Sequence, residues 1–303
     1  MNTGSSNDDP GTADTGVSHS PEKINSFKGS VVLIKYGGNA MTDETIKLGV
    51  IEDVVKLKQL GITPVLVHGG GIVIKKLLDD VGIKSEFIGG HRKTDEHAMS
   101  YVEMALSGNV NSEIVKLLNS RGARSVGISG KDAQTVTARK RIHRVIVDGE
   151  EQEADLGQVG DVDRIDTGLI ETLVQNGYIP VISPVAVGDD LKDYNINADM
   201  FAGHMAGSLQ AKAYVAMTNV DGILTDVGDP GSLIRSIQSD ELKSKIGSEI
   251  QGGMIPKIES CVIALENGVQ QAHIINGTKK HTLLHQLLTD NPPGTVIYRQ
   301  EQI

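Results

Sequence analysis

Glycines and lysines lie close together at two places in the sequence, and both arrangements suit the binding of phosphate groups. Lys35 ends a β-branched run and is followed by Gly37 and Gly38, so its ammonium group would lie beside bare backbone N–H groups. Residues 252–257 (GGMIPK) again combine glycines with a lysine, Lys257, at the start of a predicted helix. Either motif alone could be an ordinary turn beside a solvated lysine. Their occurrence together favours an anionic, phosphate-bearing ligand.

A further glycine run follows another apolar stretch. His68 is followed by Gly69, Gly70 and Gly71, and a helical pattern begins at Ile72. This arrangement favours close backbone approach to an anion at the positive end of a helix dipole over a tight connection alone. His68 itself is expected to be structural or to position the backbone, and not to act as a base.

Two polar clusters could recognise carboxylate and amide groups. Arg92 lies in a glycine-containing loop, residues 89–94, and could bind a carboxylate through two hydrogen bonds. Residues 195–199 (NINAD) precede a predicted helix, where Asn197 could equally be only a helix cap. Ligands of open α/β sheets bind at the carboxyl ends of the strands. These clusters at strand-to-helix junctions therefore predict one shared cleft.

Several well-known site motifs are absent. The chain contains no P-loop, no Gly-x-Gly-x-x-Gly fingerprint, no Gly-x-Ser-x-Gly elbow, no His-Glu-x-x-His and no Cys-x-x-Cys pair. His281 and His285 lie four residues apart on a predicted helix, but no third metal ligand is apparent. We therefore expect both histidines to be surface residues and predict no metal held by protein ligands.

The elements that must position these residues alternate between short β-branched runs and longer helical patterns, which indicates an α/β fold. The predicted strands are 31–35, 64–68, 125–129, 179–183, 213–218, 272–275 and 295–298. The predicted helices are 44–60, 72–80, 96–119, 167–176, 198–208, 256–267 and 280–289. Helices of this length suit crossovers between parallel strands.

Two segments depart from this alternation. Residues 1–28 are rich in Ser, Asp, Gly, Thr and Pro, with too few large aliphatic side chains to offset the entropy cost of ordering, so they are expected to be a disordered extension. Residues 134–163 alternate polar and β-branched residues around Asp148-Gly149, which predicts a β-hairpin insertion beside the main sheet.

The composition excludes several classes of function. The net charge is −10, from 39 acidic and 29 basic residues, and the chain has no Trp and three Phe, which argues against nucleic acid as a partner. Cys261 is the single cysteine, so no internal disulfide can form. No apolar run is long enough for a membrane span, and the amino terminus lacks the pattern of a secretion signal. We expect a cytosolic (cytoplasmic) protein with no membrane partner.

The motifs, taken in order, closely resemble those of the amino-acid kinase superfamily, and within it the N-acetylglutamate kinases. The resemblance runs from about Val31 to the carboxyl terminus and rests on KYGGNAM, VHGGG, GGHRKT, GISGKD, YNINAD, TNVDGI and GGMIPK. It implies a three-layer αβα sandwich on a mostly parallel, roughly eight-stranded open sheet. It also implies one kinase domain, 29–303, with an acyl-amino-acid lobe at 29–187 and an ATP lobe at 188–303.

The resemblance implies a reaction in which ATP, with Mg²⁺, phosphorylates the γ-carboxylate of N-acetyl-L-glutamate in arginine biosynthesis. Lys35 and Lys257 would neutralise charge on the transferring phosphoryl group, which is what phosphoryl transfer mostly requires. Asp199 would hold both lysines in place and would not act as a base, because a substrate carboxylate is already ionised at neutral pH. Mg²⁺ would enter bound to ATP oxygens and water.

The resemblance also implies binding residues on both sides of the cleft. For the acyl amino acid these are Gly70, Gly71, Arg92 and Asn195. For the nucleotide they are Gly37, Gly38, Thr218, Asn219, Asp221, Gly222, Ile223, Gly253 and Met254.

The departures from the family pattern concern regulation more than chemistry. Members inhibited by arginine typically carry an amphipathic amino-terminal helix that links dimers into a hexamer. Here the extension lacks an apolar stripe, and Thr278 and Gln286 stand where Arg and Glu are usual. We expect a homodimer as the minimum assembly, and the sequence favours neither a hexamer nor feedback inhibition by arginine. In the substrate loop, His91 stands where an apolar residue is usual.

The sequence is also consistent with two other functions. A kinase for a related acyl amino acid, such as N-acetyl-aminoadipate, would need only a different pocket length, since one methylene is worth about 1–3 kcal/mol of discrimination. A non-catalytic ligand sensor is the alternative outside enzymes. The presence of Lys35, Lys257 and Asp199 together argues against a sensor, because binding alone would not require them.

Overall fold

The computed structural model describes residues 19–147, 150–226, 228–247, 250 and 252–299. Its centre is an eight-stranded sheet in which all neighbouring strands are parallel except β17 and β18. In spatial order the strands are β16 (Ser236–Gln238), β18 (Thr295–Tyr298), β17 (Gln271–Asn276), β13 (Ala213–Thr218), β1 (Val31–Tyr36), β2 (Thr63–His68), β10 (Ile179–Ser183) and β5 (Ser125–Ser129). The expected mostly parallel, eight-stranded sheet is thus confirmed, and the seven predicted strands all belong to it.

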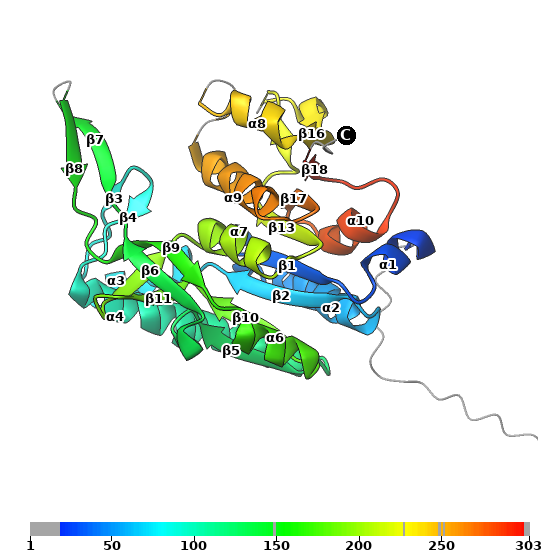
Figure 1. The fold of residues 1–303 in the computed structure, drawn as a ribbon, viewed down its shortest axis with the longest axis horizontal. Helices are drawn as coiled ribbons and strands as arrows, with labels where there is room; N and C mark the ends of the chain where they lie inside the picture. Colours follow the sequence, from blue (N-terminus) through cyan, green and yellow to red (C-terminus); the bar gives the residue numbers. More distant parts are fainter. Residues whose placement is uncertain (1–18, 148–149, 227, 248–249, 251, 300–303) are drawn as a thin grey trace, which may run out of the picture.

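Helices cover both faces of this sheet, giving three layers (Figure 1). Side chains alternate along β1, so Leu33 packs in one apolar cluster and Val32 and Ile34 pack in the other. The first cluster includes residues of α6 (Gly168–Gln175), α7 (Ala198–Ser208), α8 (Ser239–Lys245) and α9 (Ile255–Glu266). The second includes residues of α1 (Pro21–Phe27), α2 (Glu44–Gln59), α5 (Ser112–Asn119) and α10 (Thr282–Leu288).

Both ends of the longest described helix, α2, have residues that favour a helix start or stop. The side chain of Asp43 accepts a hydrogen bond from the backbone N–H of Ile46 at 2.9 Å and caps the start of α2. After Leu60, Gly61 takes a left-handed conformation (φ 79°) and ends the helix. The chain can then turn directly into β2.

A π-helical segment interrupts the predicted helix 96–119. The chain runs through α4 (Glu96–Glu103), the π-helical residues Met104–Asn111 (η2) and α5 without leaving a helical path. A third apolar cluster packs α4 and this segment against α3 (Gly71–Asp80). Because π-helical insertions shift side chains around the axis, they often occur at functional sites.

The segment 134–163 forms more than the single hairpin that we expected. Its outer strands, β6 (Val136–Lys140) and β9 (Val159–Ile165), join β11 (Val185–Gly188) and β12 (Asp193–Ile196) in a small closed barrel. Only β7 (His143–Val147) and β8 (Glu150–Ala154) form a hairpin, which projects from the body of the protein (Figure 1). The predicted turn Asp148-Gly149 lies outside the described residues.

The expectation that residues 1–28 are entirely disordered is wrong for the last part of this range. Helix α1 packs on the sheet through Phe27, which is 3% exposed, and through Ile24. The N–H of Ser20 also donates to the carbonyl oxygen of Leu288 at 2.8 Å. Two apolar residues at helical spacing are enough here because the neighbouring sheet and α10 supply the remaining contacts. Residues 1–18 lie outside the described part.

The remaining elements are short. They are the strands β3 (Phe87–Ile88), β4 (His91–Arg92), β14 (Ile223–Leu224) and β15 (Leu233–Ile234), and the 3₁₀ turns Gly38–Met41, Asp132–Gln134, Pro230–Ser232 and Gly252–Met254. Across the described residues, no helix combines the length and apolar character needed to cross a bilayer.

Candidate active site

One carboxylate joins two lysines at the carboxyl edge of the sheet. Lys35 comes from the end of β1, Asp199 from the first turn of α7 and Lys257 from the first turn of α9. The Nζ atom of Lys35 lies 3.0 Å from Oδ1 of Asp199, and Nζ of Lys257 lies 3.0 Å from Oδ2. Three residues far apart in the sequence therefore form one charged cluster, as the resemblance implied.

Burial and charge act against each other in this cluster. Burial raises the pKa of Asp199, but the charges of Lys35 and Lys257 outweigh it and hold that pKa below its usual value. Burial lowers the pKa of Lys35; the negative charge of Asp199 opposes this shift, and Lys257 adds to it. Asp199 is thus an ionised partner of both lysines, which suits an organiser and not a proton acceptor.

The first of two cavities beside this cluster, the glycine-loop cavity, has a volume of about 260 Å³. Its walls include Lys35 and Asp199 and four residues that we expected to bind the acyl amino acid: Gly70, Gly71, Arg92 and Asn195. Arg92 Nη2 donates to the carbonyl oxygen of Gly71 at 3.2 Å, and its guanidinium group lies 4.6 Å from the centroid of the Phe87 ring. A guanidinium group and a carboxylate-held ammonium group in one cavity suit a ligand with two negative groups.

A buried polar network supports the run of three glycines that follows β2. His68 Nδ1 lies 2.9 Å from the carbonyl oxygen of Gly69, so this nitrogen carries the proton, and Nε2 accepts from Asn111 Nδ2 at 3.1 Å. Burial lowers the pKa of His68 to about 4, so the ring is neutral near pH 7. Asn111 ends the π-helical segment and also donates to the carbonyl oxygen of Val181 at 2.9 Å. His68 is therefore a positioning residue, as predicted.

Gly70 is required by close packing. A Cβ atom at this position would lie 2.7 Å from Cδ2 of Leu106, which comes from the π-helical segment and lines the same cavity. Such a contact is shorter than carbon atoms tolerate, so any larger residue would displace Leu106. Because Gly70 and Gly71 carry no side chains, the backbone at the start of α3 forms this part of the cavity wall.

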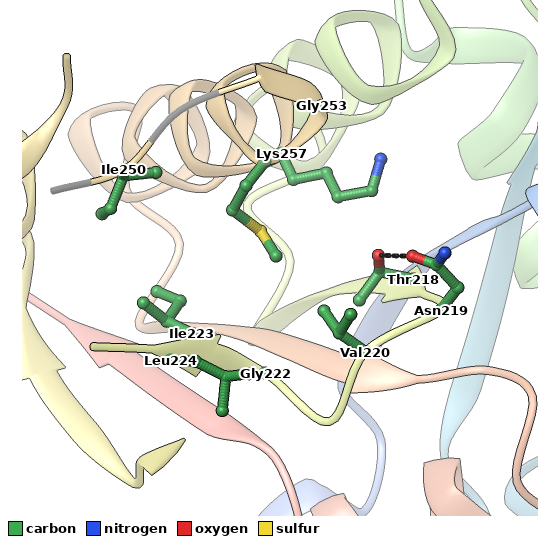
Figure 2. A pocket seen from close by; sticks show the side chains of 10 residues that line it. Thr218, Asn219, Val220, Gly222, Ile223, Leu224, Ile250, Gly253 and Lys257 are labelled. Carbon is green, nitrogen blue, oxygen red and sulfur yellow. Dashed lines mark hydrogen bonds between the residues drawn. The ribbon is translucent and has the colours of Figure 1, made fainter. Parts of the chain in front are cut away.

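The second cavity, the β13 cavity, has a volume of about 450 Å³ and lies at the end of β13. Figure 2 shows Lys257 reaching from α9 toward Thr218 and Asn219 at its edge. Its other walls are largely apolar: Val220, Gly222, Ile223, Leu224, Ile250, Gly253 and Met254. The charged cluster therefore lies between a small polar cavity and a larger apolar one, which suits a reaction between two bound molecules.

The profile of the amino acid kinase family matches residues 30–276. The chain belongs to the amino acid kinase family. The acetylglutamate kinase of Methanocaldococcus jannaschii is 46% identical to it over 278 residues, covering 91% of this chain and 93% of that protein. The acetylglutamate kinase of Moorella thermoacetica is 45% identical, covering 90% and 93%.

Solved structures of the amino acid kinase fold also superpose on this chain. N-acetylglutamate synthase from Neisseria gonorrhoeae, complexed with coenzyme A and N-acetyl-glutamate, superposes with a TM-score of 0.78 at 26% identity over 93% of this chain. The chain spans 62% of that longer protein. Carbamate kinase from Giardia lamblia bound to AMP-PNP superposes with a TM-score of 0.64 over 90% of this chain and 99% of the other; at 15% identity it shows the fold alone.

Three residues expected on the nucleotide side of this family's cleft lie outside the β13 cavity. Gly38 instead lines the glycine-loop cavity. Gly37 lies beside the same cavity, since a Cβ atom there would meet Gly69 N at 3.3 Å and Lys35 Nζ at 3.5 Å, and both of these residues line it. The carboxylate of Asp221 accepts from Asn276 Nδ2 at 2.7 Å and from Lys279 Nζ at 2.8 Å. Asp221 therefore fixes a loop beside the cavity and does not line it.

Several wall residues were not predicted. In the glycine-loop cavity these are Ile74, Phe87, Leu106, Val159 and Pro184. Nothing in the sequence separates such apolar residues from ordinary core residues. Asn197 caps α7, since its side chain accepts hydrogen bonds from the N–H groups of Asp199 and Met200, and it also lines the cavity.

The expectation of two surface histidines in the last helix is correct for His285, which is exposed, and wrong for His281. His281 Nδ1 lies 2.7 Å from Oδ1 of Asp53, a fully buried residue of α2. Burial raises the pKa of Asp53 to about 6, and the contact with His281 opposes this shift. Among the described residues, no group of three or more His, Cys, Asp or Glu side chains could hold a metal ion.

Proposed function

We propose that this chain is an acetylglutamate kinase, which transfers the γ-phosphoryl group of ATP to the γ-carboxylate of N-acetyl-L-glutamate. The observation that carries the proposal is the charged cluster between the two cavities, in which Asp199 contacts Lys35 and Lys257 at 3.0 Å each. The names of the relatives that cover about nine-tenths of the chain support the choice of acceptor.

The transfer needs charge neutralisation more than acid–base chemistry. An oxygen of the ionised acceptor carboxylate forms a bond to the γ-phosphorus, and the bond from that phosphorus to the β,γ-bridging oxygen breaks, releasing ADP. Lys35, from the acceptor side, and Lys257, from the nucleotide side, would stabilise the negative charge on the transferring group. Asp199 keeps both ammonium groups at fixed positions, so little reorganisation is needed during the reaction.

The acceptor would lie in the glycine-loop cavity with its reacting carboxylate toward Lys35. Arg92 would bind the α-carboxylate, and Asn195 would bind the acetylamino group. The backbone N–H groups that follow Gly70 at the start of α3 favour a negative group there. The volume of about 260 Å³ suits an amino acid of this size.

ATP would occupy the larger β13 cavity, whose apolar walls suit a purine base. None of the described residues that line this cavity is acidic, and both oxygens of Asp199 are held by lysines. Mg²⁺ would therefore be bound by ATP oxygens and water, and would supply further charge neutralisation.

The proposal is tested by ATP consumption with Mg²⁺ and a panel of acceptors: N-acetylglutamate, N-acetyl-aminoadipate, glutamate, aspartate, carbamate and UMP. Hydroxylamine would trap acyl phosphate products. We expect turnover with N-acetylglutamate and a higher kcat/KM than with N-acetyl-aminoadipate. A reversed ratio would move the substrate, and no turnover with any acceptor would favour the sensor hypothesis.

The role of Lys257 is tested by Lys257→Ala. Because its charge would act mainly on the transition state, we expect kcat to fall by about 10²–10³, with the affinity for acetylglutamate changed little. Isothermal titration and steady-state kinetics measure the two quantities. Equal losses in kcat and affinity would contradict the transition-state role.

We also propose a homodimer as the minimum assembly and a cytosolic location in arginine biosynthesis. Light scattering on the purified protein measures the assembly. A monomer would contradict a dimer as the minimum assembly, and a stable hexamer would contradict the expectation that hexamers do not form.

A further inference from the structure

A chain of buried hydroxyl groups lies beneath the charged cluster. Tyr214, on β13, is fully buried, and its Oη atom lies 3.0 Å from Oγ of Ser260 on α9. Ser260 Oγ donates to the backbone carbonyl oxygen of Lys257 at 2.7 Å. Since the serine has one proton and uses it for that carbonyl, the tyrosine hydroxyl must be the donor to Ser260. The phenol is therefore linked to the backbone of Lys257.

The same phenol also reaches the backbone of Asp199. Tyr214 Oη lies 3.5 Å from the carbonyl oxygen of Asp199, a longer contact than the one to Ser260. The two helices that carry Asp199 and Lys257 approach closely here, because a Cβ atom on Gly203 would lie 2.5 Å from the carbonyl oxygen of Ser260. One side chain of the central sheet thus contacts the backbone of α7 directly and the backbone of α9 through Ser260.

A purely structural explanation accounts for only part of this arrangement. A serine hydroxyl bonded to the carbonyl three residues earlier is common in helices. The phenol is not required by packing, since phenylalanine would fill nearly the same volume without a polar atom to satisfy. Around it the sheet is apolar, with Leu33 and Ala272 as its register neighbours on β1 and β17. The hydroxyl is retained where apolar groups would serve the core equally well.

We propose that Tyr214 and Ser260 are positioning residues for phosphoryl transfer, which hold the first turn of α9 so that Lys257 meets Asp199. The inference rests on the proposed kinase function. Glycines 252 and 253 precede this turn, and Gly252 has φ +63°, so the backbone that leads into α9 is permissive. The hydrogen bonds from Tyr214 to Ser260 and from Ser260 to the first turn of α9 would restrict this backbone freedom.

Neither residue acts on the substrates directly. Tyr214 and Ser260 are fully buried and line neither cavity. Burial raises the pKa of the Tyr214 hydroxyl well above its usual value, so it stays a neutral donor. Their effect must therefore pass through the position of Lys257, and a misplacement of about 1 Å can cost 10²-fold in rate.

The test compares Tyr214→Phe, Ser260→Ala and the double variant in steady-state kinetics with both substrates. We expect each single variant to lower kcat about tenfold while both KM values change less than threefold. Because the hydroxyls form one chain, the double variant should lose no more than the more damaged single variant. Multiplied losses in the double variant would contradict a shared chain.

Tyr194→Phe is the matched control. Tyr194 is also buried, and its hydroxyl donates to Asp190 Oδ2 at 2.8 Å, at the barrel and not under the lysines. We expect it to lower the melting temperature as Tyr214→Phe does, with kcat unchanged. Wild-type kcat in both Tyr214→Phe and Ser260→Ala would overturn the inference, as would equal kcat losses in Tyr194→Phe. If Tyr214→Phe does not fold, the inference is decided by comparing kcat of Ser260→Ala with kcat of the control Tyr194→Phe.

Wild-type turnover with acetylglutamate is measured first, which separates the two proposals. An inactive wild type would refute the proposed function, and the inference falls with it. An active wild type whose variants keep full kcat would refute only the positioning role.

Discussion

Replacing Asp199 by asparagine tests the organiser role most directly. The carboxylate is 6% exposed and lies 3.0 Å from the ammonium groups of both Lys35 and Lys257, so Asp199→Asn leaves two like charges without their shared partner. Removing one partner of a buried ion pair typically costs about 3–5 kcal/mol. Part of this cost disappears if Lys35 releases its proton, because burial already lowers the pKa of that lysine and Asp199 is the group that opposes this shift.

The expected kinetic consequence has a magnitude and a pH dependence. Loss of one preorganised charge at the transferring group should lower kcat by about 10²–10³, or about 3–4 kcal/mol. Since protonated Lys35 is the active form, kcat of Asp199→Asn should rise as the pH falls from 9 to 6. Wild-type kcat should change much less over the same range. Acyl phosphate trapped with hydroxylamine measures both profiles.

The matched control is Glu113→Gln. Lys47 is also a buried lysine with two carboxylate partners, since Glu44 and Glu113 each lie 2.7 Å from its Nζ atom, and it lines neither cavity. We expect this control to lower stability and to leave kcat unchanged. The organiser role is wrong if Asp199→Asn keeps kcat within threefold of wild type. A kcat that falls toward low pH in the variant would also refute it.

Three further substitutions test the glycine-loop cavity, the β13 cavity and one buried histidine. Gly70→Ala places a methyl group 2.7 Å from Leu106 Cδ2, so the KM of the acceptor should rise about tenfold with the KM of ATP unchanged; the reverse pattern would contradict the assignment of the glycine-loop cavity. In Gly222→Ala the Cβ atom would lie 2.5 Å from Thr295 Oγ1, so ATP binding should weaken while acceptor binding is unchanged. Equal losses in the binding of both substrates would contradict the assignment of the β13 cavity. Burial lowers the pKa of His273 to about 3, so below pH 6.5 the unfolded chain binds a proton that the folded chain does not. Stability should therefore fall as the pH drops, and His273→Gln should recover about 2–3 kcal/mol of that loss between pH 7 and 4.5 in urea unfolding; an unchanged loss would contradict the buried neutral ring.

Most of the central sheet could be predicted from the sequence because its strands are apolar runs bounded by glycine. The strand β16 was missed because it has three residues and one buried side chain, Ile237, which is too little for a pattern. Two of the four barrel strands, β6 and β9, were assigned to one hairpin, since alternation of polar and β-branched residues fits either partner, and β11 and β12 were not predicted. Helix α1 was missed because its contacts come from tertiary neighbours and not from its own composition.

The charged residues of the site could be predicted, and the apolar walls of the glycine-loop cavity could not. Each glycine–lysine motif alone could be an ordinary turn, but the occurrence of both, one at a strand end and one at a helix start, identified Lys35 and Lys257. Leu106 and Phe87 became wall residues only through the π-helical segment and the β3–β4 loop, whose geometry no local pattern encodes. Asp221 was placed at the nucleotide by its motif, but its carboxylate is held by Asn276 and Lys279.

The pairing of β1 with β13 has a consequence for how the chain folds. Val32 lies opposite Ala213, about 180 residues later in the sequence, and this pairing alone joins the two halves of the main sheet. Contacts of such long range form slowly, because the loop between them must close first. During synthesis the edge of β1 that pairs with β13 stays open until β13 leaves the ribosome, and an open apolar strand edge favours aggregation. Lys35 lies on β1 and Lys257 follows β13, so the site is assembled only after almost the whole chain has been made.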